Sequence, residues 1–418
     1  MDRKIAPEYF QAEELKLITP EKIALNNWID LYWIKDVKDD SIKLDIEWRA
    51  GSKYQEKPLV ATFVNKMLMA GSEDLKAKDI AEEIDYYGGY VQTELDKDHG
   101  GVTLFGLAEN MTSIFDVFEK AFSELSFPDN EFNKEVSIAL DKFKVDSKKV
   151  KVLCRRKFNE ALFGESSNYG KVATEEDFSK IHAADLRDFF KTYYQKAPVI
   201  FLTGNISDDF IERLRNWANR FNVRSNDSTV QEFVQEKGRV QVPYQDALQS
   251  AIRIGRLMFD KNHPDYFKFQ LLNTVLGGYF GSRLMANIRE DKGYTYGIGS
   301  GMSVLEDGGF FFVTTEVGAD VKENAMNEVY NEFDRLRNQP IPADELMRVK
   351  NYMLGEFLRQ TDGPISMMET FKNIYYNKLK PTYYNDFIEA IHDAAAAELQ
   401  DLANKYLNKE EMLEVVAG

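Results

Sequence analysis

Residues 276–301 read LGGYFGSRLMANIREDKGYTYGIGSG and form the most distinctive stretch of this 418-residue chain. Its glycines bracket a short helical segment that carries apolar and charged side chains. The stretch does not fit the turn that binds dinucleotide phosphates, because the glycines follow a helix-like run and the G-x-G-x-x-G spacing is absent. Its role therefore has to be inferred from the rest of the chain.

The chain repeats itself at an offset of about 210 residues, which predicts one structural unit used twice. Residues 127–131 (FPDNE) and 341–345 (IPADE) both begin an apolar-periodic helix with a proline and acidic residues. Gly-Gly pairs at 100–101 and 308–309 each precede a strand-like run. The elements recur in the same order in the two halves.

Within each half, strand-like runs alternate with amphipathic helices. The clearest of these segments are strands at 42–48, 252–256 and 310–317 and helices at 112–125, 131–146 and 321–337. The mixture predicts an α+β fold of two homologous domains, each a mainly antiparallel sheet with helices packed on one face. A polar, turn-rich stretch marks the junction, so we expect a first domain at 1–221, a linker at 222–247 and a second domain at 248–418.

Composition and charge limit the possible functions. With 53 Lys and Arg against 69 Asp and Glu, the net charge is -16, and no basic patch is present to attract nucleic acid. The lone Cys154 cannot form an internal disulfide and is expected to be structural. The charged start and the absence of long apolar runs predict no signal peptide and no membrane association, hence a cytoplasmic protein.

The stretch at 276–301 resembles the C-terminal half of the pitrilysin/insulinase-type zinc metallopeptidases, particularly their processing-peptidase-like branch. The resemblance covers the chain from about residue 18 to its end. In the second half, the family pattern S-R-L-x-x-x-I-R-x-x-x-G-x-x-Y occupies residues 282–296, preceded by Gly278. In the first half the matching segments are Arg49-Ala50-Gly51, residues 67–72 and Gly88-Gly89. This resemblance implies a two-domain fold that encloses a peptide-binding chamber with its partner chain.

The inverted zinc motif H-x-x-E-H of the family is lost. In its place stand Thr62, Asn65 and Lys66, and the third zinc ligand, a glutamate in the family, aligns without gaps with Lys142. A zinc site needs neutral imidazoles and a carboxylate, and none of these side chains supplies either. We therefore expect no metal and no cofactor in this chain.

The four histidines do not replace the lost ligands, because none has a histidine partner four positions away. Two of them, His182 and His392, follow an isoleucine at matching points of the repeat. We expect both to lie at a helix start and to serve in capping or packing.

Arg289 and Tyr296 are retained, and the resemblance implies that this arginine and tyrosine complete the active site across the chamber. A phenol and a guanidinium aimed at the scissile carbonyl stabilise the negative charge that develops there and orient the peptide. Taken singly, Arg289 fits a solvated helix end and Tyr296 a core tyrosine. Because both residues belong to a matched motif, we interpret Arg289 and Tyr296 as catalytic and substrate-binding. Arg283 is the weaker candidate and fits an ion pair that holds the fold.

The resemblance implies the non-zinc subunit of a heterodimeric metallopeptidase, which binds peptide substrate and stabilises the transition state for a zinc-bearing homologous partner. Isolated chains are possible homodimers. The alternative is a catalytically inactive structural homologue, a scaffold or peptide-binding protein, like the family's core subunits in respiratory complexes. An active homodimer with another metal requires ligands that we do not find. Chambers of this family bind peptides by strand addition, and the candidate edge strand is Tyr90–Leu95.

Overall fold

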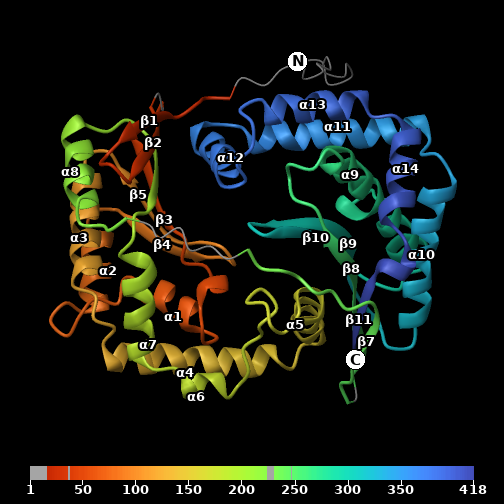
Figure 1. Ribbon diagram of the computed structural model, residues 1–418, viewed down its shortest axis with the longest axis horizontal. Coiled ribbons are helices and arrows are strands. Elements are labelled where there is room, and N and C mark those ends of the chain that lie inside the picture. Colours follow the sequence, from red (N-terminus) through yellow and green to blue (C-terminus); the bar gives the residue numbers. More distant parts are fainter. Residues whose placement is uncertain (1–16, 36–37, 224–229, 246) are drawn as a thin grey trace, which may run out of the picture.

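The computed structural model describes residues 17–35, 38–223, 230–245 and 247–418, and within them the chain forms two sheets side by side (Figure 1). The strand order of the first sheet is β1-β2-β6-β3-β5-β4, and that of the second is β7-β11-β8-β10-β9. The strands of the first sheet are β1 (Glu21–Ala24), β2 (Asp30–Ile34), β3 (Ser41–Trp48), β4 (Tyr90–Leu95), β5 (Gly100–Leu107) and β6 (Val199–Thr203). Those of the second are β7 (Gly238–Val242), β8 (Gln249–Met258), β9 (Ile298–Leu305), β10 (Gly308–Gly318) and β11 (Leu413–Ala417).

The two sheets share one topology, which confirms the predicted duplication. Removing β1 leaves five strands in each, and the order β2-β6-β3-β5-β4 corresponds strand by strand to β7-β11-β8-β10-β9. In both sheets one pair is parallel, β2 with β6 and β7 with β11, and the other pairs are antiparallel. The predicted α+β class with mainly antiparallel sheets is therefore confirmed.

Helices form the outer layers of both halves (Figure 1). Beside the first sheet lie α1 (Val60–Lys66), α2 (Ala77–Tyr86), α3 (Met111–Ser123), α4 (Asp129–Asp146), α6 (Asp177–Lys180), α7 (Ala183–Phe189) and α8 (Asp208–Ala218). Beside the second lie α9 (Tyr266–Asn273), α10 (Lys322–Asn338), α11 (Ala343–Gln360), α13 (Tyr383–Asp393) and α14 (Ala396–Tyr406). α4 and α11 begin with the two acidic segments that follow Pro128 and Pro342, as the repeat predicts.

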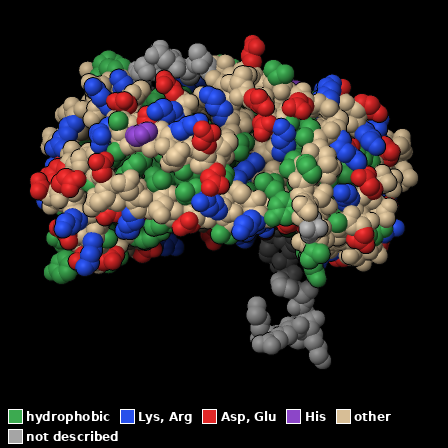
Figure 2. Space-filling model, turned by 90° about the horizontal axis from the view of Figure 1, so that it is seen from below, with side chains coloured by type: hydrophobic (Ala, Val, Ile, Leu, Met, Phe, Trp, Pro, Cys, Tyr) green, Lys and Arg blue, Asp and Glu red, His purple; other side chains and the backbone are tan. Residues whose placement is uncertain are grey.

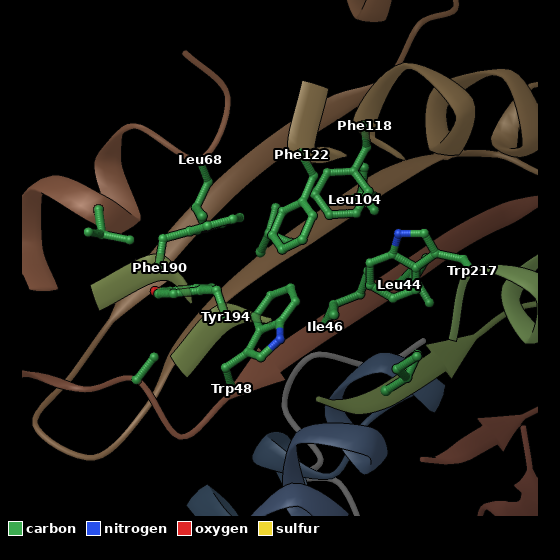
Figure 3. Close-up of a cluster of buried hydrophobic side chains, with 14 of the residues drawn as sticks. Leu44, Ile46, Trp48, Leu68, Leu104, Phe118, Phe122, Phe190, Tyr194 and Trp217 are labelled. Atoms are coloured by element: carbon green, nitrogen blue, oxygen red, sulfur yellow. The ribbon is translucent and has the colours of Figure 1, made fainter. Parts of the chain in front are cut away.

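The core of the first half lies between its sheet and these helices (Figure 3). Alternate residues of β3, Leu44, Ile46 and Trp48, point to the same face because side chains alternate along a strand, and all three are buried. The Trp48 ring stacks on Phe122 of α3 at a centroid distance of 5.4 Å. Such aromatic pairs fix the angle at which the helical layer lies on the sheet.

The opposite face of each sheet receives one helix from the other half. α5 (Val150–Phe163), in the first half of the sequence, packs on β8 and β11, and α12 (Pro364–Tyr376), in the second half, packs on β6. Both lie between the halves in Figure 1. Cys154 of α5 is buried in this contact, where its thiol donates to the carbonyl of Val415 at 3.3 Å, and burial raises its pKa to about 12. Cys154 is structural, as expected, and the halves are joined by a reciprocal exchange of helices.

Two details differ from the sequence expectations. The segment predicted as a linker contains β7, and its residues 224–229 and 246 lie outside the described residues. His182 does precede α7, but His392 lies in the last turn of α13 and starts no helix. The true counterpart of His182 is Ala395, since both backbone amides donate at 2.9 Å to an acidic side chain three residues later, Asp185 and Glu398.

Among the helices of the described residues, none combines the length and the apolar character that crossing a bilayer requires. Charges of both signs are interspersed over the face shown in Figure 2.

Candidate functional site: the interdomain cavity and the Arg289–Tyr296 segment

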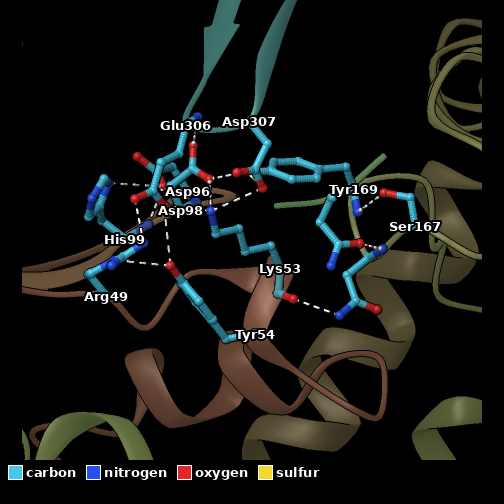
Figure 4. A network of polar contacts seen from close by, with 12 residues as sticks. Arg49, Lys53, Tyr54, Asp96, Asp98, His99, Ser167, Tyr169, Glu306 and Asp307 are labelled. Atoms are coloured by element: carbon cyan, nitrogen blue, oxygen red, sulfur yellow. Dashed lines mark hydrogen bonds and ion pairs between the residues drawn. The ribbon is translucent and has the colours of Figure 1, made fainter. Parts of the chain in front are cut away.

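The equivalent hairpin turns of the two halves, β4–β5 and β9–β10, meet where the halves face each other (Figure 4). The backbone amide of Glu306 donates to the Asp98 carboxylate at 3.0 Å. Gly51 packs directly under the first turn, and a Cβ atom there would lie 2.3 Å from the carbonyl carbon of Asp98. The Arg-Ala-Gly segment found in the sequence therefore ends in glycine because two backbones touch at this point.

Lys53 lies at the centre of this contact and is 4% exposed. Its ammonium is 2.5 Å from Glu306, 3.3 Å from Asp98 and 3.3 Å from Asp307. Burial by itself would lower the pKa of Lys53, but the carboxylates, Glu306 first, raise it above its usual value. The hydroxyl of Tyr169 also donates to Asp98, and because this phenol is neutral it adds no further charge to the network. The network is thus a buried ammonium shared by carboxylates from both halves.

Glu306 is held ionised by the same network. Burial would raise its pKa, but Lys53 and then Arg49 outweigh that effect and lower it from 4.5 to about 2. Because the folded chain binds the proton more weakly than the unfolded chain, the contribution of Glu306 to stability is complete above pH 4.5 and is lost as the pH falls toward 2.

We therefore expect the free energy of unfolding to fall with acidification between pH 4.5 and about 2, and Glu306→Gln to flatten that dependence. Urea midpoints measured across this range for wild type and variant test the expectation. Glu83→Gln, which changes an exposed carboxylate on α2, is the matched control and should keep the wild-type slope. An unchanged slope in Glu306→Gln would contradict the assignment.

A cavity of about 380 Å³ opens beside this network, and we call it the interdomain cavity. It is bounded by the end of β4, the β4–β5 turn, the β9–β10 hairpin and α12. Its lining contains six acidic side chains, one lysine and one histidine, namely Glu47, Glu94, Asp96, Asp98, Glu306, Glu369, Lys372 and His99. The excess of carboxylates makes it a site for cationic groups.

Lys372, the one lysine of that lining, is already neutralised. Its ammonium lies 2.7 Å from Asp45, 2.8 Å from Glu47 and 3.3 Å from Glu369. Burial would lower its pKa, but the three carboxylates, Glu47 first, raise it. By contrast, Glu94 at the end of β4 is exposed and forms no ion pair with any described residue.

β4 itself is an edge strand, as predicted. It runs from Tyr90 to Leu95, pairs among the described strands with β5 alone, and occupies one end of the sheet order. One row of its backbone amides and carbonyls is therefore free of strand partners. Tyr90 and its register partner Phe105 are both exposed and give this edge an apolar end, opposite the acidic end at Glu94.

The positions of the lost zinc motif lie on α1. Asn65 is buried, and its amide donates to the Gly101 carbonyl at 3.1 Å and to the Tyr194 hydroxyl at 3.2 Å. Thr62 is half-buried and Lys66 is exposed. Neither a carboxylate nor an imidazole stands among the three. Across the described part of the chain, no group of three or more His, Cys, Asp or Glu side chains is placed to hold a metal ion.

The side chain of α4 that contacts Lys66 is Glu135, whose carboxylate lies 3.8 Å from the ammonium. Lys142, the residue aligned with the third ligand, lies two turns further along the helix and is exposed. The structure therefore places Glu135 opposite the degenerate motif. The Lys66 ammonium therefore forms an ion pair with Glu135 at this place.

Tyr296 lies on the turn before β9 and is 95% exposed, so it is not a core tyrosine. The turn beneath it is braced by Thr295, whose hydroxyl donates to the Glu316 carbonyl at 2.7 Å, and by Thr315, whose hydroxyl donates to the Gly297 carbonyl at 3.0 Å. A fixed backbone thus presents a phenol to the outside.

Arg289 lies on a π-helical segment, Met285–Asp291, of the kind that often occurs at functional sites. Its guanidinium stacks on the exposed ring of Phe280, 4.7 Å from the centroid, and forms no ion pair with any described residue. Within the described residues no contact joins Arg289 to Tyr296, so the structure holds them on one segment without bringing them together. Arg283 forms a two-pronged ion pair with Glu345 at 2.8 and 2.9 Å, which confirms its fold-holding role.

Sequence reasoning missed the network around Lys53 and the carboxylates around Lys372. A signal for the former exists, because Asp98 and Glu306 each stand two residues before one of the repeated Gly-Gly pairs. No comparable signal marks Lys372, since two of its three carboxylate partners, Asp45 and Glu47, are on β3, far away in the sequence.

Comparison with known proteins places these features in a family. The family described as "Insulinase (Peptidase family M16)" matches residues 34–170, and that described as "Peptidase M16 inactive domain" matches residues 180–353. The chain is similar to an uncharacterized zinc protease, YmxG, of Bacillus subtilis, with 25% identity over 334 residues, 78% of this chain and 81% of the relative. It is also similar to a non-peptidase homolog of Helicobacter pylori, with 22% identity over 86% of this chain and 84% of that protein.

The same fold occurs in a crystal structure of a peptidase M16 inactive domain from Pseudomonas fluorescens, with a TM-score of 0.85 and 21% identity, covering 96% of this chain and 98% of that one. The two family matches are consecutive along the chain, and the second begins in the last part of the first half and extends into the second. This chain belongs to the M16, or insulinase, family of peptidases and their homologues.

Proposed function

We propose that this chain is the non-zinc subunit of a heterodimeric M16 peptidase, which binds peptide in the interdomain region and supplies Arg289 and Tyr296 to a zinc-bearing partner. The observation that carries the proposal is the exposure of Tyr296 on a braced turn. A tyrosine needed only for packing would be buried, whereas one that acts on a partner-bound substrate must face outward.

The degenerate α1 positions support the division of labour. Lys66 puts a cation where the family holds a zinc ligand, so the metal belongs to the partner. The proposal is tested by co-expressing this chain with a homologue that carries an intact H-x-x-E-H motif and measuring hydrolysis of a quenched fluorescent peptide. Activity that requires both chains supports it, and equal activity of the partner alone contradicts it.

The isolated chain is expected to bind no stoichiometric zinc and to hydrolyse no peptide, because Thr62, Asn65 and Lys66 cannot hold or use the metal. Elemental analysis of chelator-washed protein after incubation with zinc checks this. A partner subunit with an intact motif, treated identically, is the positive control. About one tightly held zinc per chain would overturn the assignment of the metal to the partner.

The peptide is expected to add as a strand to β4 and to carry basic residues toward the acidic end of that strand. Glu94→Gln should therefore weaken binding of an arginine-containing peptide by roughly threefold to tenfold, with a larger effect at low salt, because an exposed unpaired carboxylate is lost. Fluorescence anisotropy measures the affinity, and Glu83→Gln on α2 is the control. Identical affinity in Glu94→Gln at low salt would remove this residue from the site.

The alternative is a structural homologue without a proteolytic role. The Helicobacter pylori relative is named a non-peptidase homolog, which favours this alternative for that protein. In this chain it leaves the exposure of Tyr296 and the unpaired state of Arg289 without a use. The two functions differ in the effect that each predicts for Tyr296→Phe on the peptidase rate.

A further inference from the structure

The second half contains a counterpart of the lost zinc site. At the offset of 208 that matches the two Gly-Gly pairs, Lys53 corresponds in the sequence to Lys261, and α1 corresponds to residues 268–274, which are the later part of α9 and Thr274. The three α1 positions that replace the zinc motif then correspond to Gln270, Asn273 and Thr274. At the offset of 214 that matches Pro128 with Pro342, Lys142 on α4 corresponds to Glu356 on α11.

A cavity of about 340 Å³ occupies this place, and we call it the α9 cavity. It is enclosed by α9, α11, α12 and α13, and Gln270, Thr274 and Glu356 are all in its lining. Its walls combine polar side chains with aromatic ones, among them Phe357 and Phe387. The volume lies within the range of roughly 300–1,000 Å³ typical of small-molecule sites.

Lys261 lies at the wall of this cavity and, unlike Lys53, has no counter-ion. Its ammonium donates to the side-chain carbonyl of Asn373, and no carboxylate of the described residues forms an ion pair with it. Burial lowers its pKa, with no neighbouring charge to oppose the effect. The acidic residue in the lining, Glu356, is 2.6 Å from Arg359 and is neutralised there.

Two tyrosine hydroxyls add further donors. Tyr266 accepts a hydrogen bond from Gln270 at 2.6 Å, so its own proton remains to be donated. The Tyr383 hydroxyl makes no hydrogen bond to any described residue, although the side chain is only 9% exposed. An ammonium and two phenol protons therefore line a cavity whose one lining carboxylate, Glu356, is paired with Arg359.

We propose that the α9 cavity binds a carboxylate attached to an aromatic or other apolar group, with the carboxylate on Lys261, Tyr266 and Tyr383 and the apolar group against Phe357 and Phe387. A carboxylate supplies the counter-charge that Lys261 lacks among the described residues, and the aromatic side chains of the lining remove the apolar group from water. Both a free small acid and the C-terminal residue of a peptide present this chemistry.

The test uses isothermal titration calorimetry on the full chain with two matched probe pairs. The first is 3-phenylpropionate and its neutral amide, and the second is an acetylated hexapeptide that ends in phenylalanine as the free acid and as the amide. Saturable binding of an acid with much weaker binding of its amide is expected. Binding of the small acid alone identifies a free ligand, and binding of the peptide acid as well identifies a peptide terminus.

Lys261→Met should weaken binding of the acid by roughly tenfold to a hundredfold, and Tyr383→Phe by about fivefold, because a charged and a neutral hydrogen bond are lost, respectively. Lys380→Met, which removes an exposed lysine near the same helix, is the matched control and should bind as wild type. If Lys261→Met does not fold, Tyr383→Phe still tests the same site. Equal affinity for acid and amide, wild-type affinity in both variants, or no saturable binding of either acid would overturn the proposal.

Discussion

Tyr296→Phe is expected to lower the peptidase rate of the complex with a zinc-bearing partner by roughly a hundredfold or more, which corresponds to about 2.7 kcal/mol of transition-state stabilisation. The substitution removes one hydroxyl from a side chain that is 95% exposed, so no packing is lost. Assembly with the partner and the melting temperature should stay the same. Steady-state kinetics on a fluorogenic peptide, together with sedimentation of the complex, measure the two quantities separately.

Tyr86→Phe is the matched control for this experiment. Tyr86 on α2 is also highly exposed, at 83%, and the same hydroxyl is removed far from the proposed chamber. Full activity of the Tyr296→Phe complex would contradict the catalytic role and leave this chain with a structural role in the chamber. The structural alternative predicts that Tyr296→Phe leaves the peptidase rate unchanged.

Arg289 is expected to contribute to the same reaction. Its guanidinium stacks on Phe280 and forms no ion pair within the described part of the chain, so it is able to bind a carbonyl or carboxylate of the substrate. Arg289→Lys keeps the charge but loses the planar donor fork, and both turnover and peptide affinity should fall. If Arg289 were structural, the variant would change melting temperature and leave turnover intact.

The duplication made much of the fold predictable from the sequence. Because each half must bury the same set of apolar faces, matching helix starts and Gly-Gly turns were enough to predict two sheets of the same type. The edge position of Tyr90–Leu95 was predicted from the family resemblance and is confirmed by the strand order. The sequence did not show which residue of α4 faces Lys66. Glu135 and Lys142 are seven residues apart, hence two turns, and only the packing of α4 on α1 shows that Glu135 is the one that contacts Lys66.

The exchange of α5 and α12 was beyond sequence reasoning. An amphipathic helix specifies that one of its faces must be buried, but the pattern does not say against which sheet. Each of these helices follows a helix of its own half in the chain and yet packs on the other half. The burial of Lys53 has the same origin. Its carboxylate partner Glu306 is 253 residues away, so a lysine next to a turn looks solvated until the halves are brought together.

Lys53→Met is expected to destabilise the protein by about 3–5 kcal/mol, because it leaves Asp98, Glu306 and Asp307 close together without the ammonium that they share. The stem of methionine fills most of the space, so the loss is electrostatic. Urea unfolding measures it.

Lys57→Met is the matched control. Lys57 lies a few residues after Lys53, and its exposed ammonium forms an ion pair with Asp185, so its removal should lower the free energy of unfolding by at most about 1 kcal/mol. The combination of Lys53→Met with Asp98→Asn should recover part of the lost stability, because it removes one of the carboxylates left without a partner. A cavity effect would not be relieved in this way, since asparagine restores no volume. A Lys53→Met protein within 1 kcal/mol of the control would mean that the ammonium only offsets its own cost of burial, and that the exchanged helices, not the shared charge, hold the two halves together.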